Sequence, residues 1–390
     1  MTVSAHGRPS WGETLLEEPF RLFFPIGVIA TFAGVVPWVL YFAGTKSGYP
    51  GYGHGMVQIQ GFEMAFATGF LMTAVPRFLE ARGTRPWELV CGLSLCAATA
   101  LALSLDYAVA GEVLFLAISL HLSVFVLRRL RGRGDDPPPY FAFLPIGFLS
   151  AILGACLILW PLATLPRLGE LLVEQGVMLS FLLAVGSHLG PRLIYGHRGF
   201  PETTTPAAHR RLCRLFGIGL LLLLSFPLEA AGFARAGVGL RAAIVSWYLF
   251  GELKLYRAPA RALLHTHLFR LSFYSVAAGL WLVTLVPIPV SASLHLMFVG
   301  GFGLMTFVVA TRVTVGHGGF EELWETNRAA VNVPLALIAL SVPTRLAADA
   351  LPAFYFELIA GAGALWLAGA ALWGLMFVPK LAPWHVAPDD

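Results

Sequence analysis

The amino-acid sequence predicts an all-α protein, a polytopic integral membrane helix bundle, and two observations carry this prediction. Apolar residues make up 57% of the 390 positions and charged residues only 12%, against about 45–50% and about 25% in soluble domains. The apolar residues also form long runs between short polar loops, and a transmembrane helix needs about 20 apolar residues. We therefore predict a single transmembrane domain, residues 1–390, with about twelve spans.

The first half of the chain contains six apolar runs, and breaks rich in Gly and Pro separate several of them. GTKSGYPGYG follows the first run, RGTRP follows the second, and RGRGDDPPP precedes the fifth. The N-terminal segment lacks the apolar core of a signal peptide, so the first run is expected to remain in the mature protein. The six predicted spans are residues 20–43, 55–79, 87–106, 108–128, 140–161 and 171–195.

The second half of the chain also contains six apolar runs, which begin after the loop GHRGFPETTTP. The short segment VPIP separates the ninth run from the tenth. Several runs contain Gly or Pro, which membrane helices tolerate when neighbouring groups satisfy the freed carbonyl oxygens. The sequence shows no convincing internal repeat. The six predicted spans are residues 212–232, 236–256, 265–286, 290–316, 329–347 and 352–378.

The distribution of Lys and Arg predicts the orientation of the bundle. If both termini are cytoplasmic, 21 of the 26 basic residues fall in cytoplasmic segments. Cytoplasmic loops of membrane proteins carry an excess of Lys and Arg, so we predict that the N-terminus and the C-terminus both lie inside the cell. The five basic residues left on the outer side are Lys46, Arg167, Arg235, Arg241 and Arg345.

The cysteines and the net charge exclude several classes of protein. The four cysteines lie in apolar stretches without a CxxC or CxxCH pattern, which argues against a c-type haem, a disulfide framework and a structural zinc site. The charge of +4 comes from basic residues scattered among short loops, so no nucleic-acid partner is expected.

Two histidines fall at a similar depth on the predicted outer side of the membrane. His54 opens the second span and His295 lies near the start of the tenth. Two imidazoles at one depth on different helices are what axial ligation of a b-type haem requires, because neutral histidine is the commonest metal ligand. The alternative is that each histidine lies at the membrane interface and hydrogen-bonds to a backbone carbonyl group.

Further histidines lie toward the predicted cytoplasmic side. His188 ends the sixth span and His317 follows the tenth. Both adjoin Gly-rich helix ends, where a flat cofactor could approach the backbone. His265 and His267 begin the ninth span, but residues two apart do not share a helix face. We expect these last two to be solvated loop histidines.

Glu63 is the most informative acidic residue, because it lies in the middle of the second span. A carboxyl group at that depth is costly and usually faces the bundle interior. Helical spacing places Met56 and Gln60 on one stripe with Glu63. Glu63 is therefore either a proton-relay group or cofactor contact, or a neutral side chain bonded to Ser or Thr of a neighbouring helix. Glu112, nearer the end of its span, is expected to be structural.

The tenth span is rich in small residues. Gly300, Gly301 and Gly303 remove side chains from one region of it. Small residues in membrane helices usually allow close helix packing. With His295 and His317 on either side, the same region could instead form a wall against a macrocycle.

Four segments of the chain follow a known pattern: PFRLFFPIG from Pro19, HGMVQIQGFEMAFATGFLMTAVPRF from His54, VGSHLGP in the sixth span, and the run from His295 to Gly319. Together they resemble the NnrS family of twelve-span bacterial membrane proteins. That family is described as binding haem and copper and is associated with nitric oxide metabolism and nitrosative stress. The resemblance implies a multi-pass protein of the bacterial inner membrane with haem b, and possible copper, as cofactors.

The chain departs from the family pattern at one segment. Where the family has H-x-H-E-M, this chain keeps His54 but has Met56 at the second histidine position and Val57 at the acidic one. Met is a credible soft ligand for haem iron or Cu(I), so Met56 or His188 could replace a missing imidazole. Copper is therefore less strongly expected than haem.

Three functions are weighed. The first is a haem-binding membrane protein that reduces, binds or protects against nitric oxide, and that would be a haem-dependent oxidoreductase if it is an enzyme. In it His54 and His295 bind the iron, Met56, His188 and His317 serve the same or a second site, and Glu63 moves protons. The second is a transporter of a metal, haem or small anion, which the lack of a repeat disfavours. A haem–copper oxidase subunit would need more intramembrane histidines than the chain has.

Overall fold

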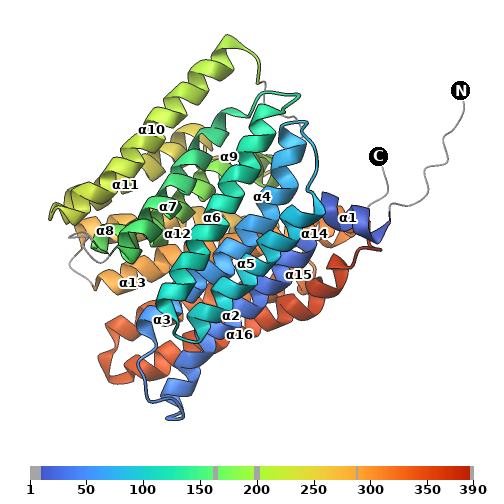
Figure 1. The fold of residues 1–390 in the computed structure, drawn as a ribbon. Helices are drawn as coiled ribbons and strands as arrows, with labels where there is room; N and C mark the ends of the chain where they lie inside the picture. Colours follow the sequence, from blue (N-terminus) through green and yellow to red (C-terminus); the bar gives the residue numbers. More distant parts are fainter. Residues whose placement is uncertain (1–9, 161–165, 197–202, 287–288, 387–390) are drawn as a thin grey trace, which may run out of the picture.

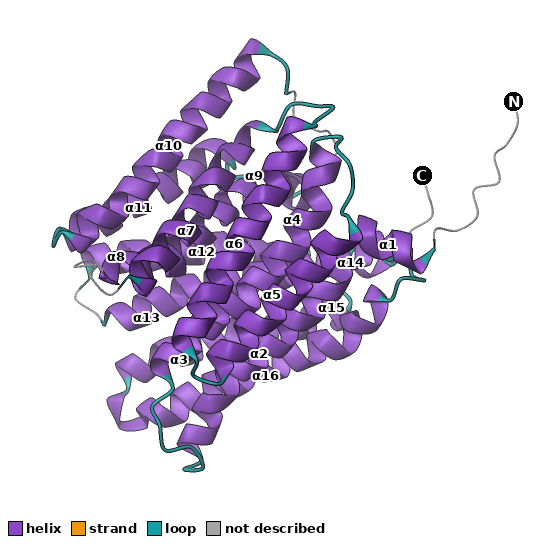
Figure 2. Ribbon diagram, viewed as in Figure 1, coloured by secondary structure: helices purple, strands orange, loops and turns teal. Residues whose placement is uncertain are grey.

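A computed structural model describes residues 10–160, 166–196, 203–286 and 289–386, and within these ranges every regular element is a helix (Figure 2). The helices pack side by side as one bundle (Figure 1). Near its N-terminal end the short α1 (Trp11–Glu17) is capped by Ser10, whose side chain accepts a hydrogen bond from the Glu13 backbone. The rings of Trp11 and Trp384 lie 5.7 Å apart, so the two described ends of the chain meet.

Ten helices in the described ranges are long and apolar enough to cross a membrane, which makes the chain a multi-pass membrane protein. They are α2 (Phe20–Phe42), α5 (Pro86–Ser104), α6 (Ala108–Arg131), η2–α7 (Pro139–Leu159), α8–η3–α9 (Pro166–Tyr195), α10 (Pro206–Ala230), α12 (Leu264–Leu285), α13–η5–α14 (Val290–His317), α15 (Ala329–Ala350) and η7–α16–η8 (Pro352–Leu381). Residue 161, the predicted end of the fifth span, lies outside the described residues.

The other two predicted spans are also helical. The second runs through α3 (Gly51–Met56), η1 (Val57–Glu63) and α4 (Met64–Phe78), and the eighth through α11 (Ala234–Trp247) and η4 (Tyr248–Glu252). Polar side chains such as Gln60, Glu63 and Arg241 lower the mean hydropathy of these two helices. The second helix begins before the predicted residue 55, because the Gly-rich loop that precedes it already turns as a helix.

Every fourth span is broken in the same way. The second, sixth and tenth spans each begin with a six-residue α-helix, continue as a π-helix, and end as a longer α-helix. Such π-helical turns are rare and often lie at functional sites. In these three spans the π-helices are η1 (Val57–Glu63), η3 (Leu172–Gly176) and η5 (Leu296–Gly303). A further π-helix, η4 (Tyr248–Glu252), ends the eighth predicted span.

The twelve predicted spans therefore fall into three units of four. The last span of each unit packs against the first span of the next: α6 on α7, α11 on α12, and α16 back on α2. This repeat is one of helix arrangement, whereas the prediction of no internal repeat concerned the similarity of residues. Few residues repeat with the architecture, for example His54-x-Met56 with His295-x-Met297, so the sequence gives little sign of it.

The second and tenth spans lie against each other along their length. Glu63 pairs with Thr306, the rings of Phe62 and Phe307 lie 5.5 Å apart, and Arg77 contacts the His317 ring. Since the partner numbers rise together, these two spans run parallel.

Two arginines inside the bundle are paired with glutamates, which offsets the cost of a charge in a low dielectric. The Arg129 guanidinium, with no exposed surface, donates to both carboxylate oxygens of Glu88 at 3.1 and 2.7 Å. Arg241 is equally buried and pairs with Glu229. These pairs join α6 to α5 and α11 to α10.

Candidate functional site

The structure brings His54 and His295 together, as their common depth predicts. His54 lies in α3 and His295 ends α13 (Val290–His295), each just before a π-helix. Their ring centroids are 6.5 Å apart and the ring planes differ by 7°. The parallel second and tenth spans thus present two facing imidazoles at one end of their shared interface.

Backbone hydrogen bonds fix the same tautomer in both rings. Nδ1 of His54 is 2.9 Å from the carbonyl oxygen of Gly34, and Nδ1 of His295 is 2.7 Å from that of Ser291. A carbonyl oxygen only accepts, so each Nδ1 carries the hydrogen and each Nε2 keeps its lone pair. Neither Nε2 has a hydrogen-bond partner among the described residues. Metal-binding histidines are commonly oriented by such a bond from the other ring nitrogen.

The spacing of the two rings suits one shared metal ion. Metal–nitrogen distances of about 2.0–2.1 Å place two ligating nitrogens about 4 Å apart, and the ring centres lie farther out. The observed 6.5 Å between centroids is compatible with that arrangement. His54 and His295 are therefore the two residues of this interface that could hold a metal ion between them. No cluster of three or more His, Cys, Asp or Glu that could hold a metal ion occurs within the described ranges.

The glycines of the tenth span serve helix packing. A Cβ atom on Gly301 would lie 2.5 Å from Val276 of α12, and one on Gly303 would lie 2.4 Å from Trp366 of α16. These positions are filled by neighbouring helices rather than open to a macrocycle. Of the two alternatives for this segment, the close approach of helices describes the structure.

Met56 points away from the imidazole pair. Its sulfur is 4.0 Å from the amide nitrogen of Gln60, and that amide donates to Glu112 at 2.7 Å. Residues two apart on a helix face different directions, so Met56 and His54 do not converge. All three side chains of this group, Met56, Gln60 and Glu112, are buried.

Glu63 faces the tenth span. The Thr306 hydroxyl donates to Glu63 at 2.6 Å. Thr306 is thus the hydroxyl group of a neighbouring helix that the second alternative for Glu63 requires. Gln60 instead faces Glu112 of α6, so Gln60 and Glu63 do not share a stripe, and that expectation is wrong. The cause is the π-helix η1, whose wider turn rotates the side chains away from α-helical register.

His317 lies at the opposite end of the same two spans, in a group of charged residues. Its Nδ1 is 2.5 Å from Glu18, which also accepts hydrogen bonds from Arg21 at 2.6 Å and Arg77 at 3.1 Å. Glu18 lies outside the spans. Burial alone would raise its pKa, but the His317 hydrogen bond and the charges of His317 and Arg21 lower the pKa to about 2. Arg21 also donates to the Ala382 carbonyl group at 3.1 Å.

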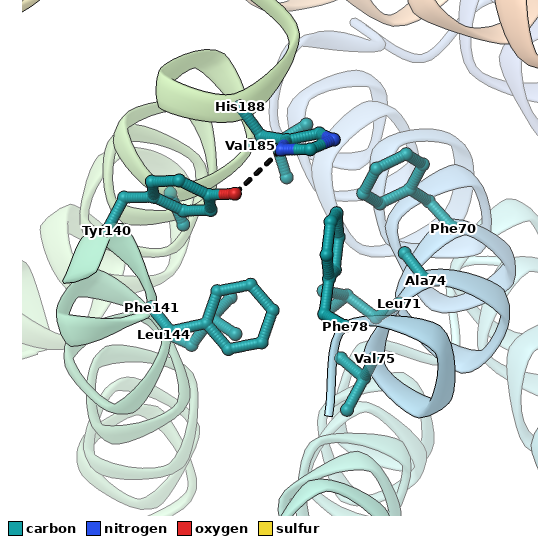
Figure 3. A pocket seen from close by; sticks show the side chains of 11 residues that line it. Phe70, Leu71, Ala74, Val75, Phe78, Tyr140, Phe141, Leu144, Val185 and His188 are labelled. Carbon is teal, nitrogen blue, oxygen red and sulfur yellow. Dashed lines mark hydrogen bonds between the residues drawn. The ribbon is translucent and has the colours of Figure 1, made fainter. Parts of the chain in front are cut away.

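His188 forms a third, separate group. The Tyr140 hydroxyl and His188 Nδ1 are 2.6 Å apart, and both residues are buried. The Phe78 ring lies 4.4 Å from the imidazole. Together they line a small cavity whose remaining walls are apolar (Figure 3), formed by Phe70, Leu71, Ala74, Val75, Phe141, Leu144, Ala184 and Val185.

A family model described as NnrS protein matches residues 14–383. The chain belongs to the NnrS family. No curated protein matches it. Two of the segments that resemble the NnrS pattern, PFRLFFPIG and the run from His295 to Gly319, meet in the structure, because Arg21 of the first donates to the His317 carbonyl group of the second at 3.3 Å. NnrS-like sequence therefore gathers at both ends of the interface between the second and tenth spans.

Sequence reasoning missed one buried histidine. His265 has no exposed surface, its Nδ1 lies 3.3 Å from Asn332, and its ring lies 4.2 Å from that of Trp324. The expectation of a solvated loop residue is wrong for His265, whereas His267 is exposed. Leu268 and Phe269 are also buried, and their spacing of three and four residues from His265 is the helical signal that could have identified it.

Proposed function

We propose that this chain binds haem b through His54 and His295 and acts in nitric oxide or nitrosative-stress metabolism, by reducing, binding or protecting against nitric oxide. The observation that carries the proposal is the pair of facing imidazoles, each oriented by a backbone carbonyl group and each with its Nε2 lone pair available. Membership of the NnrS family supports the link to nitric oxide.

In this proposal the chain's own residues position the cofactor. His54 and His295 would hold the haem iron, and the hydrogen bonds from their Nδ1 atoms would strengthen each imidazole as an electron-pair donor. Haem would supply one-electron and gas-binding chemistry, while the protein sets ligation and polarity. Turnover of nitric oxide would make the protein a membrane oxidoreductase.

Copper is a weaker part of the proposal. Met56, His188 and His317 each contact a different set of residues, so we propose them as contacts of a second site rather than as further ligands of the imidazole pair. A copper ion bound to that pair would have to use the same two imidazoles as haem. In the proposal these three residues therefore contact a second site separately from one another.

Glu63 is proposed as a proton-relay residue for this site. It lies 3% exposed between the second and tenth spans, on the interface that carries the imidazole pair. The Thr306 hydroxyl is a partner through which a proton on Glu63 could be passed.

We also propose twelve spans, with both termini in the cytoplasm of a bacterial cell and the bundle in the inner membrane. The second and tenth spans run parallel, so an odd number of crossings must separate them. Six of the ten long apolar helices lie between them, and α11–η4 makes seven if it also crosses the membrane. The parallel direction of the second and tenth spans therefore supports α11–η4 as the eighth span. The meeting of Trp11 and Trp384 supports termini on one side.

Transport of a metal, haem or small anion is the alternative. The threefold architecture removes the argument that the chain lacks a repeat. The polar residues nevertheless form separate pairs rather than a line across the bundle. Substrate flux in proteoliposomes, from protein without a bound chromophore, would favour transport.

The direct test is an absorbance spectrum with haem and metal quantification, on full-length protein purified in detergent after expression with ample haem. We expect a Soret band that shifts on reduction with dithionite and again on addition of nitric oxide. A protein without such a band would contradict the proposal.

A further inference from the structure

Gln60 of η1 and Glu112 of α6 form a buried polar pair that the proposed haem site does not use. The Gln60 amide nitrogen donates to Glu112 Oε1 at 2.7 Å, and both residues are 1% exposed. Glu112 is the fifth residue of α6, about 6 Å along the helix axis from its first residue at 1.5 Å per residue. The pair therefore lies inside the bundle near the connection between α5 and α6.

The orientation of the Gln60 amide is fixed by its neighbours. One amide hydrogen goes to Glu112 Oε1, and the nitrogen also faces the Met56 sulfur at 4.0 Å. The opposite orientation would turn the amide oxygen toward two acceptors. The amide oxygen of Gln60 is thus the atom of this side chain that lacks a hydrogen-bond partner.

Two buried oxygen atoms of this pair have no hydrogen-bond partner: Gln60 Oε1 and Glu112 Oε2. Both are acceptors if Glu112 is ionised. No Lys, Arg or His side chain of the described ranges pairs with Glu112. An ionised carboxylate would then be buried in the membrane without a counter-charge, which is costly.

The neighbouring ionisable groups do not compensate for this charge. Glu63 faces Thr306 of α14, and Glu88 of α5 is paired with Arg129. His121, on α6 itself, lies nine residues beyond Glu112, more than two helical turns away. A proton on Glu112 Oε2 removes the charge and supplies the missing donor.

We propose that Gln60 and Glu112 form a proton-binding site, in which Glu112 holds one exchangeable proton. Glu112 Oε2–H donates to Gln60 Oε1 while the Gln60 amide donates to Glu112 Oε1, so that an acid and an amide face each other through two hydrogen bonds. Binding adds one proton and changes no covalent bond between heavy atoms. The site is separate from Glu63 and needs no haem.

Water can supply the proton from the α5–α6 connection. Leu105, Asp106 and Tyr107 of this connection are exposed. A Cβ atom on Gly53 would lie 3.3 Å from the Asp106 carboxylate, so the connection also lies beside the helix that carries His54. The proton-binding site therefore lies toward the same end of the bundle as the imidazole pair.

The test is infrared spectroscopy of the full-length protein in lipid, in H2O and in D2O, with the variants Glu112→Gln, Gln60→Leu and Glu357→Gln. Glu357 is an exposed acidic residue and serves as the matched control. We expect a carbonyl band of a protonated carboxyl group that shifts in D2O, disappears in Glu112→Gln and persists in Glu357→Gln. Gln60→Leu should move it to higher frequency, because the carbonyl oxygen loses its hydrogen bond.

A protonated-carboxyl spectrum that is identical in Glu112→Gln and in the unmodified protein, so that no such band belongs to Glu112, would overturn the proposal. So would a Glu112 band that does not shift in D2O, since the proton would then not exchange. If Glu112 instead gives the band of an ionised carboxylate and the protein holds a tightly bound sodium or potassium ion, the site binds a metal cation rather than a proton. These readouts do not depend on haem, so the proton-binding site and the haem proposal fail separately.

Discussion

Replacing Glu18 by Gln should destabilise the protein at neutral pH and remove a specific loss of stability in acid. Glu18 is 7% exposed and accepts hydrogen bonds from His317, Arg21 and Arg77. Its pKa falls from the ordinary 4.5 to about 2. At 1.36 kcal/mol for each pKa unit this corresponds to about 3 kcal/mol.

The lowered pKa of Glu18 determines how the stability of the protein changes with pH. The contribution of Glu18 is fully present above its unfolded pKa of 4.5 and is lost as the pH falls toward the folded value of about 2. Unfolding in mixed micelles, measured at pH 7 and near pH 3, should show a smaller difference between the two pH values in Glu18→Gln than in the unmodified protein. The exposed Glu17 provides the control Glu17→Gln. Equal acid sensitivity in both variants would refute the reasoning.

Three further predictions use the same unfolding assay. Glu88→Leu should cost about 3–5 kcal/mol because it leaves the Arg129 charge buried and unpaired, and adding Arg129→Leu should recover most of the loss; additive losses would contradict this. Thr306→Val should cost about 1 kcal/mol by removing the donor to Glu63, with Thr306→Ser nearly neutral; equal effects would show that the hydroxyl is not used. Gly301→Leu should prevent stable folding, because its Cβ would lie 2.5 Å from Val276, whereas an unchanged midpoint would show that α12 can move aside.

The membrane class and most spans could be predicted from the sequence, because runs of apolar residues directly reflect the length of a helix in lipid. The meeting of His54 and His295 was also predictable, since depth along a span follows from residue count once the topology is assigned. Both inferences depend on distances along single helices, which the sequence records.

Features that depend on contacts between helices were not predictable in this way. The π-helix η1 turns Gln60 and Glu63 toward different helices, and no residue pattern in the second span signals its extra width. The burial of His265 depends on Trp324 and Asn332, which are distant in sequence. The partners of His188 and His317 likewise come from distant parts of the chain, Tyr140 and Glu18. Sequence alone therefore places these two histidines at a similar depth but does not show that they belong to different groups.

The measurement that tests the central claim most directly is the absorbance spectrum of His54→Ala, His295→Ala and His209→Ala, each purified after expression with haem. His209 is exposed and lies outside the imidazole pair. The account predicts that either of the first two substitutions alters or abolishes the haem spectrum and that His209→Ala leaves it unchanged. Identical spectra for all three variants would contradict the assignment of His54 and His295 as haem ligands.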